Sequence, residues 1–390
     1  MSAGRVLFYV QHLLGIGHTM RAAQLTRAMR RAALDVTYVA GGFDAIETDL
    51  AGAGLLRLPP VRAADASFTS LVGADGAPID DAWRARRRTA LLDAFHAADP
   101  DLVLIEMFPF GRWQFRFELL PLLQAARGRA QVVCSVRDIL VAKSEPSRLA
   151  AIVDTVERHF ATVLVHGDPD FIPLDETFAP ARQIAHKLRY TGYVAPEPPA
   201  CAMDESAAAV IVSAGGGGTG GALMRAALAA RPLSPLAAAT WRFLTGPSLS
   251  DRERTALAPQ PGVVIEPARP DFRALLAAAA LSVSQAGYNT VMDLLTCRTR
   301  SVLVPFSSHG QTEQALRARR LAERGWAEVV AEEELTPARL AAAIGRALAN
   351  DAHRPDGIDL DGARRSAAIL AGLIGGTTLR EAEPAPHISL

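Results

Sequence analysis

Apolar runs of strand length alternate with helix-periodic segments along most of this 390-residue chain. In the first half these runs lie at 6–10, 36–40, 102–105, 131–134 and 163–165, and in the second half at 210–212, 241–244, 263–265, 281–283, 301–304 and 328–330. Such alternation predicts a doubly wound α/β fold, in which helices cover both faces of a parallel sheet. Because the chain is too long for one ordinary core, we expect two such domains.

A proline-rich segment separates the two halves. Pro196, Pro198 and Pro199 forbid a helix and interrupt any central strand. The domains are therefore predicted as follows: a first α/β domain at 1–193, a linker at 194–206, a second α/β domain at 207–358, and a C-terminal helix and tail at 359–390.

The charge balance argues against nucleic acid as the main partner, because 41 basic side chains cancel 41 acidic ones. The three cysteines form no Cys-x-x-Cys pair, so neither a zinc site nor a disulfide framework is expected, and a reducing cytosol fits best. The first ten residues do not show the pattern of a leader and no run of 18 apolar residues occurs, so we expect a cytoplasmic protein that is at most peripheral to the inner face of a membrane.

Two arginine-rich segments bear on that membrane question. The segment 108–117 mixes aromatic residues with arginines and could touch lipid or an apolar acceptor, but packing of the aromatics against the sheet is the favoured interpretation. The basic run 84–88 is expected to be a solvated helix face.

Two small-residue turns in the second half each join a strand to a helix. One is the glycine run 215–221, and the other is Gly287 to Thr290. Backbone N–H groups at a helix start can bind an anion, and two such starts in one domain favour a diphosphate. Glycines also serve ordinary tight turns, which is the alternative for either segment alone.

Polar residues near these turns could hold the rest of a nucleotide sugar. Asp293 lies six residues after Gly287, where its carboxylate could accept hydrogen bonds from ribose hydroxyls, or could simply favour the positive end of a helix. Gln311 and Gln314 follow the strand-like run 301–304, and amides can both donate to and accept from sugar hydroxyls.

The first strand of the chain leads into Gly15, Gly17 and His18. A helix start disfavours a cationic imidazole, so we expect His18 to be neutral and available as a base, although a cap or surface histidine is the common alternative. A dinucleotide site is not favoured, because Met20 stands where its third glycine belongs and no acid follows the second strand.

Further polar residues follow the other first-half strands, at the edge where functional loops gather. We predict an acceptor side formed by Gly15, Gly17, Glu106, Arg137, Asp138 and His166. The pairs Asp99/Asp101 and Asp168/Asp170 look like metal-binding motifs only superficially, since turn chemistry explains both. No metal and no cofactor are expected.

The motif set resembles the MurG-type glycosyltransferases, which are glycosyltransferase family 28-like. The matching segments are 213–217, 284–290, Asp293, 304–305 and 311–315 in the second half and 15–18 in the first. The resemblance implies a GT-B fold, with two Rossmann-like domains facing across a cleft, and inverting, metal-independent transfer from a nucleoside diphosphate sugar, most simply a UDP-sugar.

The resemblance also implies roles for individual residues. The diphosphate would lie among Gly216, Gly217, Ser284, Gly287 and Tyr288, with Ser213, Asn289 and Thr290 as further donor-binding residues. Asp293 would hold the ribose, Gln311 and Gln314 the sugar, and Ala268 and Arg269 the base. His18 would be the general base. Two departures concern the donor, because the family's ribose acid is usually Glu, and Gly310 stands where the family has His or Asp.

Both a lipid-linked compound and a small molecule fit as the acceptor. Two other readings stay open. A UDP-sugar 2-epimerase shares this fold and would act without an acceptor, whereas a non-catalytic sugar-nucleotide-binding subunit would bind the donor and never turn it over.

Overall fold

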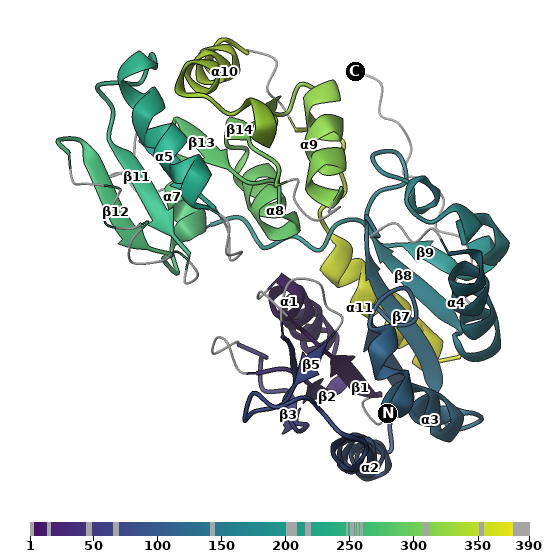
Figure 1. Ribbon diagram of the computed structural model, residues 1–390. Helices are drawn as coiled ribbons and strands as arrows, with labels where there is room; N and C mark the ends of the chain where they lie inside the picture. Colours follow the sequence, from purple (N-terminus) through teal and green to yellow (C-terminus); the bar gives the residue numbers. More distant parts are fainter. Residues whose placement is uncertain are drawn as a thin grey trace, which may run out of the picture.

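The computed structural model contains two α/β domains (Figure 1). It describes residues 4–13, 17–43, 49–64, 70–140, 145–199, 209–214, 220–246, 249, 253, 255, 257, 260–306, 312–350 and 355–376. Gly15, Gly216, Gly217 and Gln311 of the predicted site lie outside these residues.

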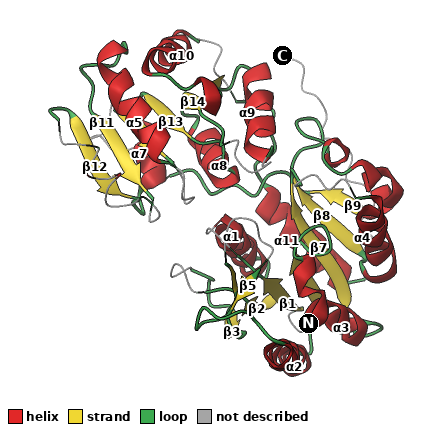
Figure 2. Cartoon of the chain, viewed as in Figure 1, coloured by secondary structure: helices red, strands yellow, loops and turns green. Residues whose placement is uncertain are grey.

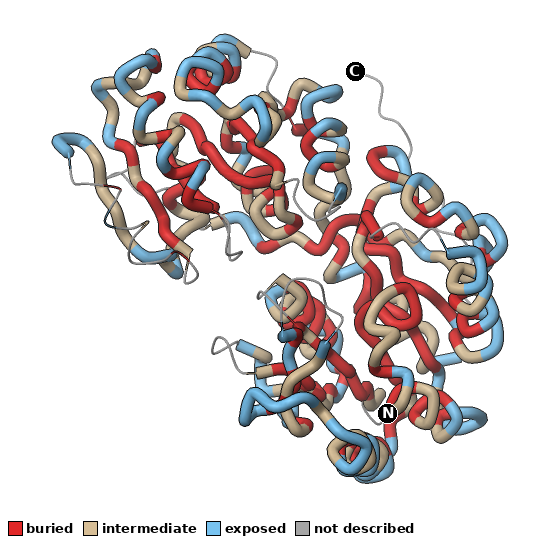
Figure 3. Tube along the Cα trace, in the orientation of Figure 1, coloured by how far each residue is buried: buried red, intermediate tan, exposed pale blue. Residues whose placement is uncertain are grey.

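The first domain is built on a parallel sheet with the strand order β3-β2-β1-β6-β7-β8-β9. The strands are β1 (Arg5–Val10), β2 (Asp35–Ala40), β3 (Gly54–Arg57), β6 (Leu102–Glu106), β7 (Gln131–Arg137), β8 (Thr162–His166) and β9 (Leu188–Tyr190). The central strands are buried on both faces, which is why they read as continuous apolar runs (Figure 3). All five predicted strands are present, whereas the edge strands β3 and β9 were not predicted.

Helices cover both faces of this sheet (Figure 2). They are α1 (Gly17–Arg31), α2 (Asp81–Ala98), α3 (Arg116–Ala126) and α4 (Pro146–His159), with 3-10 turns η1 (Trp113–Phe115), η2 (Leu174–Glu176) and η3 (Ala179–Lys187). A small antiparallel pair, β4 (Arg62–Ala63) and β5 (Leu71–Val72), completes the domain.

The second domain repeats the plan with the parallel strand order β12-β11-β10-β13-β14-β15. The strands are β10 (Val210–Ser213), β11 (Trp241–Thr245), β12 (Val263–Pro267), β13 (Leu281–Ser284), β14 (Ser301–Leu303) and β15 (Glu328–Val329). The helices are α5 (Gly221–Ala230), α7 (Phe272–Ala278), α8 (Tyr288–Cys297), α9 (Glu313–Glu323) and α10 (Pro337–Ala349), with 3-10 turns η5 (Arg231–Leu233) and η7 (Glu332–Glu334). The prediction of two doubly wound parallel sheets is confirmed.

The last helix, α11 (Gly362–Ile374), returns to the first domain and packs against α1 (Figure 1). Ala367 and Leu370 are buried in the same cluster as Val6 and Leu25. The chain therefore passes between the domains twice. The two connecting segments are hydrogen-bonded to each other, since Tyr193 N donates to Asp359 O at 2.7 Å.

One basic residue of the run 84–88 departs from the solvated face that the sequence predicted. Arg87 is fully buried, and its Nε donates to Glu118 Oε2 at 2.8 Å. Its Nη1 donates to Gly41 O at 2.8 Å, so the guanidinium ties α2 to α3 and to the exit of β2. A fully buried charge persists there because it is paired and hydrogen-bonded.

The aromatic segment 108–117 packs inward, as favoured from the sequence. Phe108, Phe110 and Phe115 are buried in the main core of the first domain. The guanidinium of Arg148 covers the ring of Trp113, with 3.9 Å from Cζ to the ring centroid. Within the described part of the chain, no helix is long and apolar enough to cross a bilayer.

Candidate functional site

His18 lies in the first turn of α1 and pairs with the last residue of β6. Its Nδ1 is 2.7 Å from Glu106 Oε1, and Arg21, one turn further along α1, donates to the same oxygen. Strands β1 and β6 are neighbours in the sheet, which brings the end of β6 beside the start of α1. Glu106 is thus a buried partner of His18, and its predicted place on the acceptor side stays a prediction.

The protonation of this pair follows from its surroundings. Burial opposes the charge on Glu106, but His18, Arg21 and Arg112 together hold its pKa at about 2. Burial lowers the pKa of His18 to about 4, although Glu106 acts in the opposite direction. At neutral pH Glu106 is therefore an anion and His18 is neutral, and burial is the largest cause that lowers the pKa of His18.

This charge state also fixes the histidine tautomer. An ionised carboxylate can only accept, so the proton of the neutral imidazole lies on Nδ1, facing Glu106. The Nε2 atom then carries the lone pair. Because the His18 side chain is 17% exposed, an outside molecule can reach it, whereas Glu106 at 1% cannot be reached.

The start of α8 meets the start of α1 from the other domain. Asn289 Nδ2 donates to Gly17 O at 3.4 Å. Gly287 is the N-cap of α8, and no side chain among the described residues caps its free N–H groups. The two turns that the sequence assigned to donor and acceptor are therefore neighbours, and Asn289 and Gly17 lie where the domains face each other.

Two serine hydroxyls lie at the carboxyl ends of the central strands of the second sheet. Ser213 ends β10 and Ser284 ends β13, and the two residues pair in register. Both side chains are buried, and their Oγ atoms have no hydrogen-bond partner within the described ranges. A buried hydroxyl without a partner is uncommon and is consistent with a place beside a ligand.

Asp293 lies one turn further along α8, on the same side as Asn289 and Thr296. Burial raises the pKa of its carboxyl to about 7, although Arg273 acts in the opposite direction. Its role toward a ribose stays a prediction, but a half-buried carboxyl with a raised pKa is the kind of group that marks a functional position.

Gln314 makes bonds that the sequence did not predict. Its Oε1 accepts from the backbone N–H groups of Ala286 and Phe306, both at 3.1 Å. The side chain therefore ties the exit of β13 to the exit of β14. Only its Nε2 is left to contact a sugar.

The predicted base-binding residues follow β12, at the outer edge of the second sheet. Ala268 N donates to Thr245 O at 3.1 Å, which holds this loop against the exit of β11. Arg269 is paired with Glu266 at 3.3 Å and with Asp271 at 2.6 Å. Contact with a base stays a prediction for both residues.

Tyr288 was predicted at the diphosphate, but its side chain lies in the joint between the domains. Its hydroxyl accepts from Val194 N at 3.0 Å. Its ring lies between Arg21, at 5.4 Å, and Arg317, at 5.5 Å, measured from Cζ to the ring centroid. The backbone N–H of Tyr288 is the part of this residue that can still face an anion.

Two residues predicted on the acceptor side, Arg137 and Asp138, form ion pairs between the domains. Arg137 Nη1 lies 2.6 Å from Glu313 Oε2, and Arg317 Nη2 lies 3.0 Å from Asp138 Oδ1. Arg317 and Asp138 are both fully buried. Glu313 and Arg317 are one turn apart on α9, so a two-residue segment after β7 pairs with one face of that helix.

His166, which was predicted on the acceptor side, is fully buried. Its Nε2 is 2.7 Å from Ser135 Oγ, and its Nδ1 is 2.9 Å from Thr191 Oγ1. Burial lowers its pKa to about 3, so the ring is neutral. These bonds join β7 to the segment after β9, which is a structural role.

Four residues of the site were not found from the sequence: Arg21, Arg112, Glu313 and Arg317. Arg21 carries a usable signal, because a residue three positions after His18 shares its helix face. Arg112 reaches the site from the loop after β6, and Glu313 and Arg317 reach it because the two domains dock.

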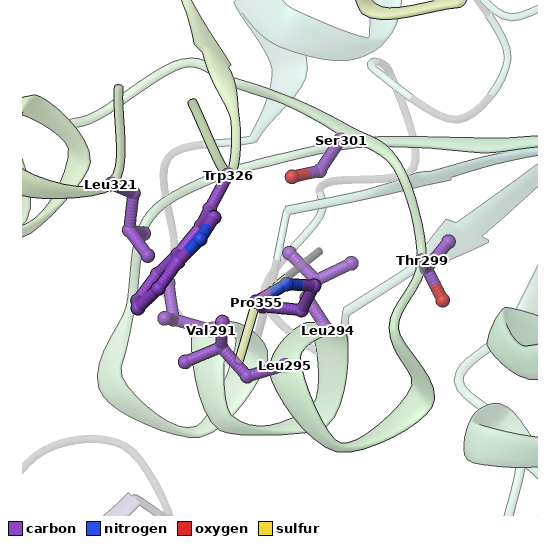
Figure 4. Close-up of a pocket in the computed structure, with 8 residues that line it drawn as sticks. All are labelled: Val291, Leu294, Leu295, Thr299, Ser301, Leu321, Trp326 and Pro355. Carbon is purple, nitrogen blue, oxygen red and sulfur yellow. The ribbon is translucent and has the colours of Figure 1, made fainter. Parts of the chain in front are cut away.

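A small cavity in the described part of the chain lies against α8, and none of the predicted site residues lines it (Figure 4). It is about 10 Å³, room for one water at most. Its walls are mainly apolar, formed by Val291, Leu294, Leu295, Thr299, Ser301, Leu321, Trp326 and Pro355. The described residues also contain no group of three or more His, Cys, Asp or Glu side chains that could hold a metal ion.

Comparison with known proteins identifies the second domain. Residues 210–356 match the glycosyltransferase family 28 C-terminal domain. A UDP-N-acetylglucosamine–N-acetylmuramyl-(pentapeptide) pyrophosphoryl-undecaprenol N-acetylglucosamine transferase of Syntrophotalea carbinolica is 34% identical over 118 residues, 30% of this chain and 32% of that protein. The equivalent transferase of Geobacillus thermodenitrificans is 36% identical over 104 residues, 26% of this chain and 29% of that protein. These matches span about a third of the curated relatives' length.

Solved structures match nearly the whole chain and show the fold. The calicheamicin glycosyltransferase CalG4 superposes with a TM-score of 0.62 at 20% identity, over 97% of both chains. MurG of Acinetobacter baumannii superposes with a TM-score of 0.60 at 14% identity, over 94% of this chain and 99% of that one. The predicted GT-B fold is confirmed.

Proposed function

We propose, from the premise that residues 210–356 belong to the glycosyltransferase family 28 C-terminal domains, that this protein is a metal-independent, inverting glycosyltransferase. Its donor is a nucleoside diphosphate sugar, and its acceptor carries a hydroxyl group. One observation supports this most: an uncapped helix start of the donor domain meets the helix start that carries the His18–Glu106 pair.

The chemistry is a single displacement. The acceptor oxygen attacks the anomeric carbon from the face opposite the diphosphate while His18 Nε2 takes its proton. The bond between the anomeric carbon and the diphosphate oxygen breaks, and its electron pair leaves with the diphosphate. Glu106 stabilises the imidazolium that forms, and N–H groups at the starts of α8 and α5 stabilise the departing charge.

The donor lies along the carboxyl edge of the second sheet. Its diphosphate is held by the turn after β13 with Ser284 and Gly287, and by Ser213 with the glycine turn that follows it. Asp293 would accept hydrogen bonds from the ribose hydroxyls, and the amides of Gln311 and Gln314 would bind the sugar. Uridine is the nucleoside named for the curated relatives, while a structure of the glycosyltransferase SsfS6 holds thymidine diphosphate, so both diphosphates belong in the first experiment.

Binding and turnover separate this proposal from its alternatives. Calorimetry with UDP, TDP, GDP and ADP should identify one nucleotide that binds, and mass spectrometry of the matching nucleotide sugar with cell extract should reveal a product heavier by one sugar. Isomerisation or hydrolysis without extract would favour the epimerase. Binding with no product in any extract would favour the non-catalytic subunit.

The raised pKa of Asp293 makes donor binding depend on pH. Ribose hydroxyls donate to the carboxylate, so only the ionised form binds well, and with a pKa of about 7 that form is lost as the pH falls. From pH 8 to pH 6 the Kd should rise about fivefold to tenfold. UDP-N-acetylglucosamine is the ligand to titrate, because its diphosphate is esterified at both ends and does not itself change charge in this range.

The matched variant is Asp293→Asn, which keeps the size of the side chain and removes its titration. Its Kd should be weak and flat across the same pH range. An equal pH dependence in the variant and the parent would take Asp293 out of the ribose site.

A further inference from the structure

Four arginines belong to the candidate site, and three of them have a carboxylate partner. Arg21 is paired with Glu106, Arg137 with Glu313 and Arg317 with Asp138. Arg112 is the fourth. Among the described residues no carboxylate lies within ion-pair distance of it, and its single hydrogen bond runs from Nε to Gln11 O at 2.7 Å.

The loop after β6 holds Arg112 in an unusual way. Its backbone is in the left-handed region, with φ at 57°, where residues other than glycine are uncommon. The side chain is only partly exposed, and its two terminal nitrogens have no partner in the described part of the chain. These two nitrogens are donors that an anionic ligand could bind.

The electrostatics locate this guanidinium beside the base. Its charge is among the causes that lower the pKa of His18 and that of Glu106. Burial lowers the pKa of Arg112 itself; Glu106 acts in the opposite direction, and the charges of Arg137 and Arg21 lower it further. His18 and Arg21 share Glu106 Oε1, and Glu106 Oε2 has no hydrogen-bond partner among the described residues. Arg112 therefore senses the charge of Glu106 without forming an ion pair with it.

We propose that Arg112 binds an anionic oxygen group of the acceptor, a phosphate or a carboxylate, next to the hydroxyl that His18 deprotonates. The inference rests on the proposed function and narrows its acceptor to an acidic compound. The planar fork of a guanidinium matches both groups with two parallel hydrogen bonds. The donor diphosphate is a less suitable ligand, because Arg112 belongs to the first domain and lies at the exit of β6.

The test uses the full chain with its donor site filled. Protein saturated with UDP is titrated with inorganic phosphate and, separately, with acetate, and binding is followed by calorimetry. Arg112→Gln should weaken the anion that binds by at least about tenfold, the loss expected for a charge-assisted pair, and should leave the Kd for UDP within about twofold.

Arg148→Gln is the matched control, because Arg148 is another partly buried arginine of the same domain without a carboxylate partner in the described residues, and its charge is held over the Trp113 ring. That variant should bind the anion as the parent does. The inference would be overturned if neither phosphate nor acetate bound to the UDP complex, or if Arg112→Gln bound the anion as well as the parent does. Either result would leave the proposed function standing. Failure of every nucleoside diphosphate to bind would instead count against the proposed function.

Discussion

Replacing His18 with glutamine should lower the turnover number of sugar transfer by about a hundredfold to ten-thousandfold, the range for loss of a general base. Glutamine can still donate a hydrogen bond to Glu106, so the buried carboxylate keeps that partner. Alanine would remove the hydrogen bond that His18 makes to it. Because His18 lies outside the donor domain, the Kd for UDP should change by less than about twofold. Steady-state kinetics and calorimetry on the same preparation measure both quantities.

The pH profile adds a second readout for the same residue. A base with a pKa of about 4 is neutral, and therefore active, at every pH well above that value. If His18 is the base, the rate of sugar transfer at saturating donor should be constant around neutral pH. It should fall only as the pH approaches 4. His159→Gln, at the far end of α4, is the matched control and should keep the parent rate. Parent-like turnover in His18→Gln would remove this residue from the role of base.

The core strands could be predicted from the sequence because their burial leaves a plain pattern. Strands such as 102–106 are covered on both faces and read as unbroken apolar runs. Edge strands such as β3 and β9 are short, partly exposed and partly polar, so they carry no comparable pattern.

The site was predictable only where it depends on chain order. A strand followed by a small turn and a helix puts Gly287 and His18 at carboxyl edges without further information. The partner of His18 depends on strand order. Strand β6 lies next to β1, although 91 residues lie between the last residue of β1, Val10, and the first residue of β6, Leu102. The pairing of Arg137 and Asp138 with α9 depends on how two domains dock, and no local pattern in either segment encodes that.

Domain docking leads to the second large effect, on stability. Arg317→Met should lower the free energy of unfolding by about 3–5 kcal/mol, the cost of removing one partner from a buried ion pair. Asp138 would remain buried without its counter-ion, and Ala286 O would lose the bond it now accepts from Arg317 Nη1 at 3.0 Å. Urea unfolding followed by circular dichroism gives the change, provided that the slope with denaturant matches the parent.

Two further variants separate a buried charge from a lost contact. Arg319→Met, two residues along α9, removes a 61% exposed arginine that lies 3.5 Å from Glu176, and should cost less than about 1 kcal/mol. Arg317→Met combined with Asp138→Leu should recover much of the loss, since no charge is then left inside the interface. If Arg317→Met cost no more than Arg319→Met, the pair would not hold the domains together. If the double variant were instead stable but transferred sugar poorly, that result would mean that the ion pair positions the start of α9, which carries Gln314.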